Sequence, residues 1–176
     1  DRSSSYFDSE ESLTVYEIVN AFEYASYDDD VEIVFLDLSY LSISSVSAYE
    51  VGKSIQLLKK NGKKVIAYGD FLSQSQYLLA SYADEIILNP FGMVFLEGFK
   101  KYQIYLKDFL DNNNIVVNTF VAGDYKSATE IFSESKMTEQ DRQQSKIFLN
   151  DLWRNWLKEV SNNRSSLDVD INFFIN

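Results

Sequence analysis

Residues 31–38 of this 176-residue chain read Val-Glu-Ile-Val-Phe-Leu-Asp-Leu, a nearly continuous apolar run that follows the acidic turn at residues 28–30. Successive side chains of a strand point to opposite faces of its sheet, so a strand that is apolar at consecutive positions is expected to be covered on both faces. Such strands are typical of parallel sheets with helices packed against them. This run therefore predicts a buried strand in an α/β fold.

Amphipathic segments and short apolar runs alternate along the rest of the chain. We expect helices over residues 9–26, 46–61, 73–82 and 102–110 and from 138 onward, and further strands over 64–68, 85–88, 93–96 and 115–121. Gly62 stands where a left-handed helix cap is expected, residues 89–92 form a turn, and residues 138–141 have the form of a capping box. The long last helix carries Ile147, Trp153, Trp156, Leu157 and Val160, and its tryptophans are expected to be core residues rather than a ligand platform. Short strands separated by helices favour right-handed crossovers and a mainly parallel sheet, although a plain doubly wound sheet fits the same pattern.

Composition excludes several classes of function. The chain has 16 Lys and Arg against 27 Asp and Glu, a net charge of −11, which disfavours nucleic acid and anionic lipid surfaces as partners. No run approaches the roughly 20 apolar residues that cross a bilayer, so the chain as given is expected to be soluble. The carboxylates at residues 28–30 are read as a solvated turn, and we expect no metal and no cofactor. The absence of cysteine does not decide the compartment.

The chain also has no histidine, the commonest general base in acyl transfer. Lys126 stands in the block Gly-Asp-Tyr-Lys-Ser-Ala at residues 123–128, in a break between a strand-like run and a helix-like one. A lysine amine acts as a general base when burial lowers its pKa far enough to leave neutral amine near pH 7. An ordinary solvated lysine fits the same composition, so the wider sequence context has to decide between the two.

That context is a resemblance carried by several segments in a specific order. They are residues 33–38, 62–68, 75–86, 89–92, 123–128 and 152–157. In order and spacing the chain resembles the signal peptide peptidase A family, also called protease IV, over most of residues 31–164. The resemblance implies a ClpP/crotonase-like spiral of β-β-α units. It is closest to the amino-terminal half of the long form, in which one half supplies a general-base lysine and the other a nucleophilic serine.

Carried over residue by residue, the resemblance makes Lys126 the match to the catalytic lysine, with Gly123, Tyr125 and Ser127 as supporting residues of the same block. Halves that carry the nucleophile have a small-Ser-Gly-Gly-Tyr run, and here Gln74 occupies the serine position. Their glycine-containing oxyanion turn is replaced by residues 39–44, which hold neither glycine nor proline. Ser73 and Ser75 flank Gln74, but serines at a helix start are more often caps than nucleophiles. The nucleophile is therefore expected to be absent from this chain, and the chain alone to be inactive.

The resemblance implies a bacterial serine endopeptidase with a Ser/Lys dyad at the extracytoplasmic face of the inner membrane, degrading cleaved signal peptides and other apolar peptides. The implied partners are a carboxy-terminal homologous half that carries the serine and further copies in a tetramer. Residues 1–164 are expected to form the half-domain and residues 165–176 a linker or tail toward the second half. Two alternatives stay open at this point: a noncatalytic scaffold or oligomerisation half of the same fold, and an acyl-CoA enzyme of the crotonase type.

Overall fold

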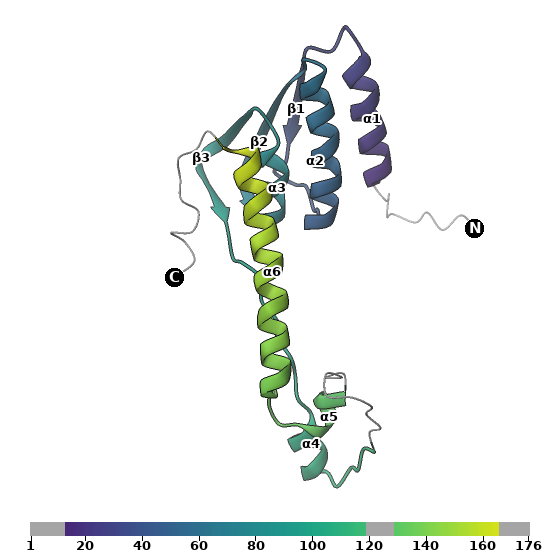
Figure 1. The fold of residues 1–176 in the computed structure, drawn as a ribbon, viewed down its shortest axis with the longest axis vertical. Coiled ribbons are helices and arrows are strands. Elements are labelled where there is room, and N and C mark those ends of the chain that lie inside the picture. The colour runs from purple at the N-terminus through teal and green to yellow at the C-terminus, as the bar shows by residue number, and fades with distance from the viewer. Residues whose placement is uncertain (1–12, 119–128, 166–176) are drawn as a thin grey trace, which may run out of the picture. The chain divides into compact units, whose positions relative to one another are not determined.

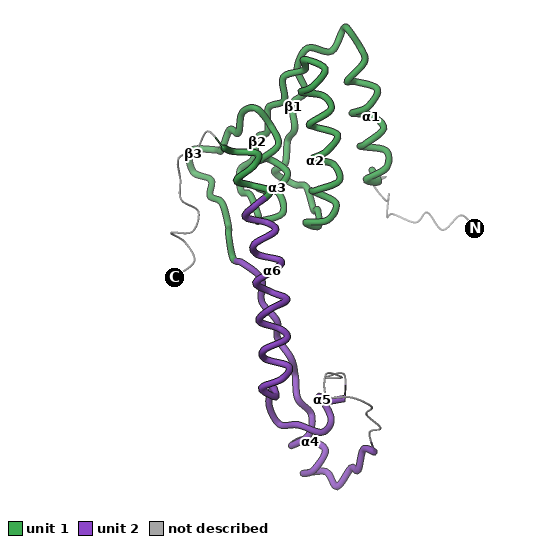
Figure 2. Tube along the Cα trace, viewed as in Figure 1, with its two compact units in different colours: residues 1–97, 159–176 green, residues 98–158 purple. Residues whose placement is uncertain are grey.

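The computed structural model describes residues 13–118 and 129–165. The chain divides into two compact units, one of residues 1–97 and 159–176 and the other of residues 98–158 (Figure 2). The long carboxy-terminal helix contributes residues to both units. The expected boundary between residues 164 and 165 stays a prediction.

The first unit is built on a parallel sheet (Figure 1). Its strands are β1 (Ile33–Asp37), β2 (Lys64–Ser73) and β3 (Glu85–Phe95), in the order β1-β2-β3. β1 pairs with β2 from Ile33 opposite Lys64, and β2 pairs with β3 from Ile66 opposite Glu85. The predicted α/β class and parallel sheet are confirmed, and they are consistent with a ClpP-like fold.

β3 joins the two short strands and the turn that the sequence predicts into one bulged strand. Gly69 pairs with Leu88 and Phe71 with Met93, so residues 89–92 lie opposite the single residue Asp70. A Cβ atom on Gly92 would lie 1.9 Å from the backbone oxygen of Asp70, closer than any real contact. Glycine is therefore required where the bulge brings the two backbones together.

In the described part of this unit, three helices lie wholly within it beside the end of the long last helix, and local capping sets where each of the three begins. They are α1 (Val15–Tyr27), α2 (Ser45–Lys60) and α3 (Gln74–Ser81). α1 starts at Val15 because Thr14 and Glu17 form a capping box; the predicted start at residue 9 lies outside the described residues. α2 is capped by Ser44, and Gly62 follows its end with a φ of +81°, as predicted.

The core of this unit lies between α2, α3 and one face of the sheet, and α1 packs on α2. Its buried side chains include Ala48, Val51, Ile55, Leu58, Val65, Ala67, Leu72, Leu78, Leu79, Ala80 and Tyr82. The ring of Tyr82 occupies the place that a side chain at position 52 would take, which is why α2 has glycine there. Ile33 and Phe35 on the other face of the sheet are 55% and 58% exposed. The prediction that this strand is covered on both faces is therefore wrong within the described residues, because both helices that contact the sheet lie on one face.

The second unit contains an irregular segment at residues 98–106, then α4 (Lys107–Asn112), α5 (Glu130–Ser133) and most of α6 (Glu139–Asn163). The predicted helix over residues 102–110 begins late, since residues 102–106 are not helical and the Leu106 amide donates to the Ile131 carbonyl instead. Residues 115–118 of the predicted strand are irregular, with the Ile115 amide closing the end of α4 on the Leu110 carbonyl.

α6 begins after Thr138, whose hydroxyl accepts from the Asp141 amide at 3.2 Å, so the expected cap is present. Trp153 and Trp156 stack at 5.1 Å between ring centres, and Trp156 is buried, as expected for a core tryptophan. Leu157 and Val160 are also buried, whereas Ile147 is 64% exposed. No described helix is long and apolar enough to span a membrane.

Candidate active site

Lys126, the predicted general base, lies outside the described residues, together with Gly123, Tyr125 and Ser127. The residues that follow this block are described. Thr138 Oγ1 donates to the Glu130 carboxylate, at 3.0 Å and 3.1 Å from its two oxygens. The Leu106 amide donates to the Ile131 carbonyl at 2.7 Å. The segment that follows the lysine block is thus fixed both to the start of α6 and to the segment before α4.

A polar cluster surrounds the start of α6. The Lys101 amine donates to Asp141 at 2.8 Å and 3.0 Å and to the Ser145 hydroxyl at 2.8 Å, and Asp141 is 5% exposed. The Tyr105 hydroxyl is also buried, and among the described residues it has no hydrogen-bond partner. Burial raises the pKa of Tyr105, and the nearby Asp141 and Glu130 carboxylates raise it further. Nothing in the sequence pattern marks this cluster, because its members come from three separate segments.

Gln74 lies where the resemblance would place a nucleophile, and it is the first residue of α3, directly after the last residue of the central strand β2. Ser73 is the N-cap of α3: its hydroxyl accepts from the Gln76 amide at 3.4 Å, and its own amide donates to Gln76 Oε1 at 2.7 Å. This capping box gives Ser73 the structural role expected for a serine at a helix start. Ser75 Oγ lies 2.9 Å from Ser45 Oγ at the start of α2.

Residues 39–44, where an oxyanion turn would lie, are held by Gln76. Gln76 Nε2 donates to the Leu38 carbonyl at 2.8 Å and to the Leu41 carbonyl at 2.7 Å. An oxyanion needs converging N–H donors, whereas this turn directs two backbone carbonyls at a buried amide. At the place where the sequence lacks the glycine turn, the structure has a turn whose carbonyls anchor α3 through Gln76.

A second polar network lies beside the bulge between β2 and β3. Asp70 Oδ1 accepts from the Tyr68 hydroxyl at 2.7 Å and from the Asn89 amide at 2.8 Å, and these residues come from β2 and β3. The hydrogen bond to Asp70 raises the pKa of Tyr68. Asp70 and Asn89 also line an open hollow of about 160 Å³ together with Phe71, Phe91 and Gly92. Sequence reasoning missed this network, since only the strand pairing brings Asn89 of β3 to Tyr68 and Asp70 of β2.

The comparisons with known proteins agree with the resemblance. The profile of peptidase family S49 matches residues 57–172. The chain belongs to this family. It is 36% identical over 154 residues to Protease 4 of Haemophilus influenzae and 36% identical over 152 residues to Protease 4 of Salmonella typhi, which covers 87% and 86% of this chain. It is also 26% identical over its full length to the chloroplastic serine protease SPPA of Arabidopsis thaliana. The chain spans about a quarter of the length of these relatives, 25% of each bacterial protein and 26% of the plant one.

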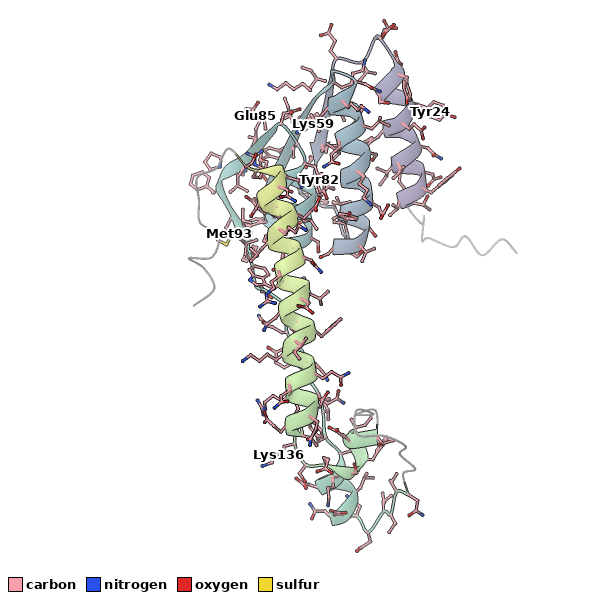
Figure 3. The ribbon with its side chains drawn as sticks, in the orientation of Figure 1. Tyr24, Lys59, Tyr82, Glu85, Met93 and Lys136 are labelled. Atoms are coloured by element: carbon pink, nitrogen blue, oxygen red, sulfur yellow. The ribbon has the colours of Figure 1, made fainter. Side chains whose placement is uncertain are left out.

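The S49 match includes the Ala83-Asp84 pair that follows α3, and the structure gives this pair a structural role. Asp84 Oδ2 accepts from the Val65 amide at 2.8 Å, and Asp84 Oδ1 lies 3.2 Å from the Lys59 amine. Lys59 also donates to the Tyr82 carbonyl at 3.0 Å; both residues are labelled in Figure 3. These contacts tie the end of α3 to β2 and α2. Among the described residues, no group of three or more acidic side chains is arranged to hold a metal ion.

Proposed function

We propose that this S49 chain is the amino-terminal half of a membrane-associated serine endopeptidase with a Ser/Lys dyad, and that Lys126 is its general base. The nucleophilic serine comes from a homologous carboxy-terminal half on a partner domain. The substrates are cleaved signal peptides and other apolar peptides at the extracytoplasmic face of the bacterial inner membrane, and the working form is a homo-oligomer, a tetramer by resemblance. The chain alone is inactive.

The observation that carries this proposal is the structure around Gln74. The position of the nucleophile holds an amide, the hydroxyl of Ser73 caps α3, and the hydroxyl of Ser75 pairs with Ser45. The Leu38 carbonyl, just before residues 39–44, and the Leu41 carbonyl, within them, both accept from the Gln76 side-chain amide. A protease of this family that lacks both nucleophile and oxyanion turn in one section needs another section to supply them.

In the proposed reaction the neutral amine of Lys126 takes the proton of the serine hydroxyl on the partner domain. The serine oxygen attacks the peptide carbonyl and forms a tetrahedral intermediate. When this intermediate collapses, the protonated lysine donates its proton to the leaving amine, and the first part of the peptide departs. Water then hydrolyses the acyl-enzyme, with the same amine as base. Lys126→Arg is expected to fail as completely as Lys126→Ala, because a guanidinium group does not release its proton near neutral pH.

The experiment compares peptide cleavage by the whole parent protein with cleavage by its Lys126→Ala variant, with size-exclusion profiles of both. Loss of cleavage in an intact assembly supports the proposal. Retained cleavage removes Lys126 as the base.

A noncatalytic scaffold half is the second candidate, and the same contacts favour it, since each described serine beside Gln74 has a structural partner. If Lys126→Ala changes the assembly without a separate effect on turnover, the scaffold function replaces the catalytic one.

A further inference from the structure

A hollow of about 160 Å³ opens beside the bulge of β3 in the first unit. We call it the bulge hollow, and its lining residues are Asp70 and Phe71 of β2 and Asn89, Phe91 and Gly92 of β3. Gly92 precedes Met93, which is labelled in Figure 3, and it lies against the backbone of Asp70. The hollow is therefore formed by two paired strands, whose register fixes its walls.

One carboxylate lines the bulge hollow, and hydrogen bonds hold it in place. Asp70 Oδ1 accepts from the Tyr68 hydroxyl at 2.7 Å and from the Asn89 amide at 2.8 Å. A carboxylate has about four acceptor positions on its two oxygens, and both of these bonds use Oδ1. Among the described residues, no lysine or arginine forms an ion pair with Asp70. The carboxylate thus keeps capacity for a further donor.

The surroundings of the bulge hollow add negative charge. The hydrogen bond to Asp70 raises the pKa of Tyr68, and the charge of the Asp37 carboxylate, which pairs with Tyr68 in register, raises it further. Of the chain's 27 Asp and Glu, 19 lie in the first unit, together with only 7 of its 16 Lys and Arg. The excess of negative charge therefore lies on the unit that carries the hollow, and it attracts cations.

Two aromatic side chains complete the lining. Phe91 is 92% exposed and Phe71 is 51% exposed. The face of an aromatic ring attracts a cation, and an exposed ring also offers apolar surface to the methylene stem of a lysine or arginine. A metal ion fits less well, since no group of three or more acidic side chains in the described part of the chain is arranged to hold one. A fixed carboxylate beside aromatic rings is the chemistry that binds an ammonium or guanidinium group.

We propose that the bulge hollow binds a basic side chain, lysine or arginine, of a peptide substrate, with the Asp70 carboxylate as its ion-pair partner and the rings of Phe71 and Phe91 against its stem. This inference rests on the proposed function in one respect, that the substrates are peptides. Signal peptides carry a positively charged segment before their apolar run. The bulge hollow then holds the basic end of a cleaved signal peptide.

The position of the hollow along β2 suits this role. Phe71 lies three residues before Gln74, about 10 Å along an extended strand. Gln74 occupies the position of the nucleophile in the serine-carrying half of the resembled family. A section that lacks the serine can still bind the substrate here, because an ion pair with Asp70 needs no nucleophile.

The test measures the binding of two labelled peptides to the full-length parent protein carrying Lys126→Ala, in which the proposed function leaves the peptides intact. Both peptides have an acetylated amino terminus, two lysines, an apolar run of leucine and alanine, and a fluorescent label. In the second peptide both lysine side chains are acetylated, which keeps their length and removes their charge. Fluorescence anisotropy gives the two Kd values, and their ratio is the lysine preference.

Asp70→Asn is the test variant, because asparagine keeps the size of the side chain and an oxygen for the bonds from Tyr68 and Asn89. Asp29→Asn is the matched control, since Asp29 lies exposed in the turn after α1 and its replacement removes the same charge. We expect a lysine preference of about fivefold, the size of a partly exposed ion pair with a cation–π contact. Asp70→Asn should abolish this preference, and Asp29→Asn should keep it.

Three results would each overturn the inference: equal Kd values for the two peptides, an unchanged preference in Asp70→Asn, or an equal loss in Asp29→Asn, which would assign the preference to net charge alone. Phe91→Leu decides the question if circular dichroism shows that Asp70→Asn is misfolded. Because Phe91 is almost wholly exposed, its replacement leaves the fold intact, and the loss of its ring should lower the preference about twofold. An unchanged preference in this variant counts against the inference.

The binding site and the proposed catalysis fail separately. Mass spectrometry of the peptides shows whether the Lys126→Ala protein still cleaves them. Retained cleavage overturns the general base alone, and the lysine preference is then read from the ratio of the two KM values. Intact peptides that bind without a lysine preference overturn the bulge hollow alone.

Discussion

Gln76 is the residue whose loss should most clearly damage the region around Gln74. Its side chain is 8% exposed and takes part in three hydrogen bonds to backbone groups, at Leu38, Leu41 and Ser73. In Gln76→Met the length of the side chain is kept and all three bonds are lost. At about 1 kcal/mol net for each bond, the loss is about 3 kcal/mol. Burial of the more apolar methionine offsets on the order of 1 kcal/mol, which leaves about 2 kcal/mol of destabilisation.

The assay is urea unfolding of the wild-type and variant chains, followed by far-ultraviolet circular dichroism. The matched control is Gln143→Met, because Gln143 is exposed on α6 and its amide makes only a 3.3 Å contact with Glu139. We expect the control to change the free energy of unfolding by less than about 0.5 kcal/mol. Equal effects of the two substitutions would refute the reasoning, since they would show that the three buried bonds contribute nothing beyond those of a surface glutamine.

Two further predictions concern the backbone and the pH dependence of stability. Gly92→Ala should destabilise the chain more than Gly62→Ala: the first puts a Cβ atom 1.9 Å from the Asp70 oxygen, whereas the second meets no atom within 4 Å and is strained only by its φ of +81°. Thermal unfolding of the two variants ranks them, and the reverse order would contradict the described bulge. Burial raises the pKa of Tyr82, and its hydrogen bond to Glu159 at 2.6 Å raises it further. The folded state therefore holds this proton more tightly, so its contribution to stability is present below the ordinary tyrosine pKa of about 10 and is lost as the pH rises above it. Tyr82→Phe should reduce the fall in stability above pH 10, and an unchanged alkaline profile would show that Tyr82 does not contribute to it.

Local sequence signals predicted the elements whose ends depend on neighbouring residues. α2 is the example, since Ser44 caps its start and Gly62 follows its end. The predicted helix at residues 102–110 failed where a distant partner intervened, because the Leu106 amide bonds to Ile131. The sequence predicted a turn at residues 89–92 but not that these residues form a bulge in β3. The bulge depends on the register between β3 and β2, which the local sequence does not show.

The residues of the candidate site also fall into two groups: those whose role follows from the local sequence and those whose contacts require the fold. The capping role of Ser73 follows from sequence, and the Ser-Gln-Ser-Gln order at residues 73–76 also contains the spacing that marks Gln76 as the second member of a capping box. The bonds from Gln76 to Leu38 and Leu41 span more than thirty residues, so they require the fold. The bond from Asn89 to Asp70 joins two strands and also requires the fold, whereas Tyr68 and Asp70 are only two residues apart on β2. Lys126 stays a prediction from sequence.

The contacts around Gln74 also bear on whether a serine at that position would restore a nucleophile. Sites that perform chemistry commonly keep polar groups available for the substrate, at a cost in local stability. Here both hydrogen bonds of the α3 capping box are formed, and the buried side-chain amide of Gln76 donates to the Leu38 and Leu41 carbonyls of the neighbouring turn. Gln74→Ser alone would supply a hydroxyl without N–H donors for the oxyanion, because Gln76 would still fix residues 38–41 in their present conformation. The missing serine and the missing turn are therefore coupled through Gln76, and under the proposed function a partner section supplies both.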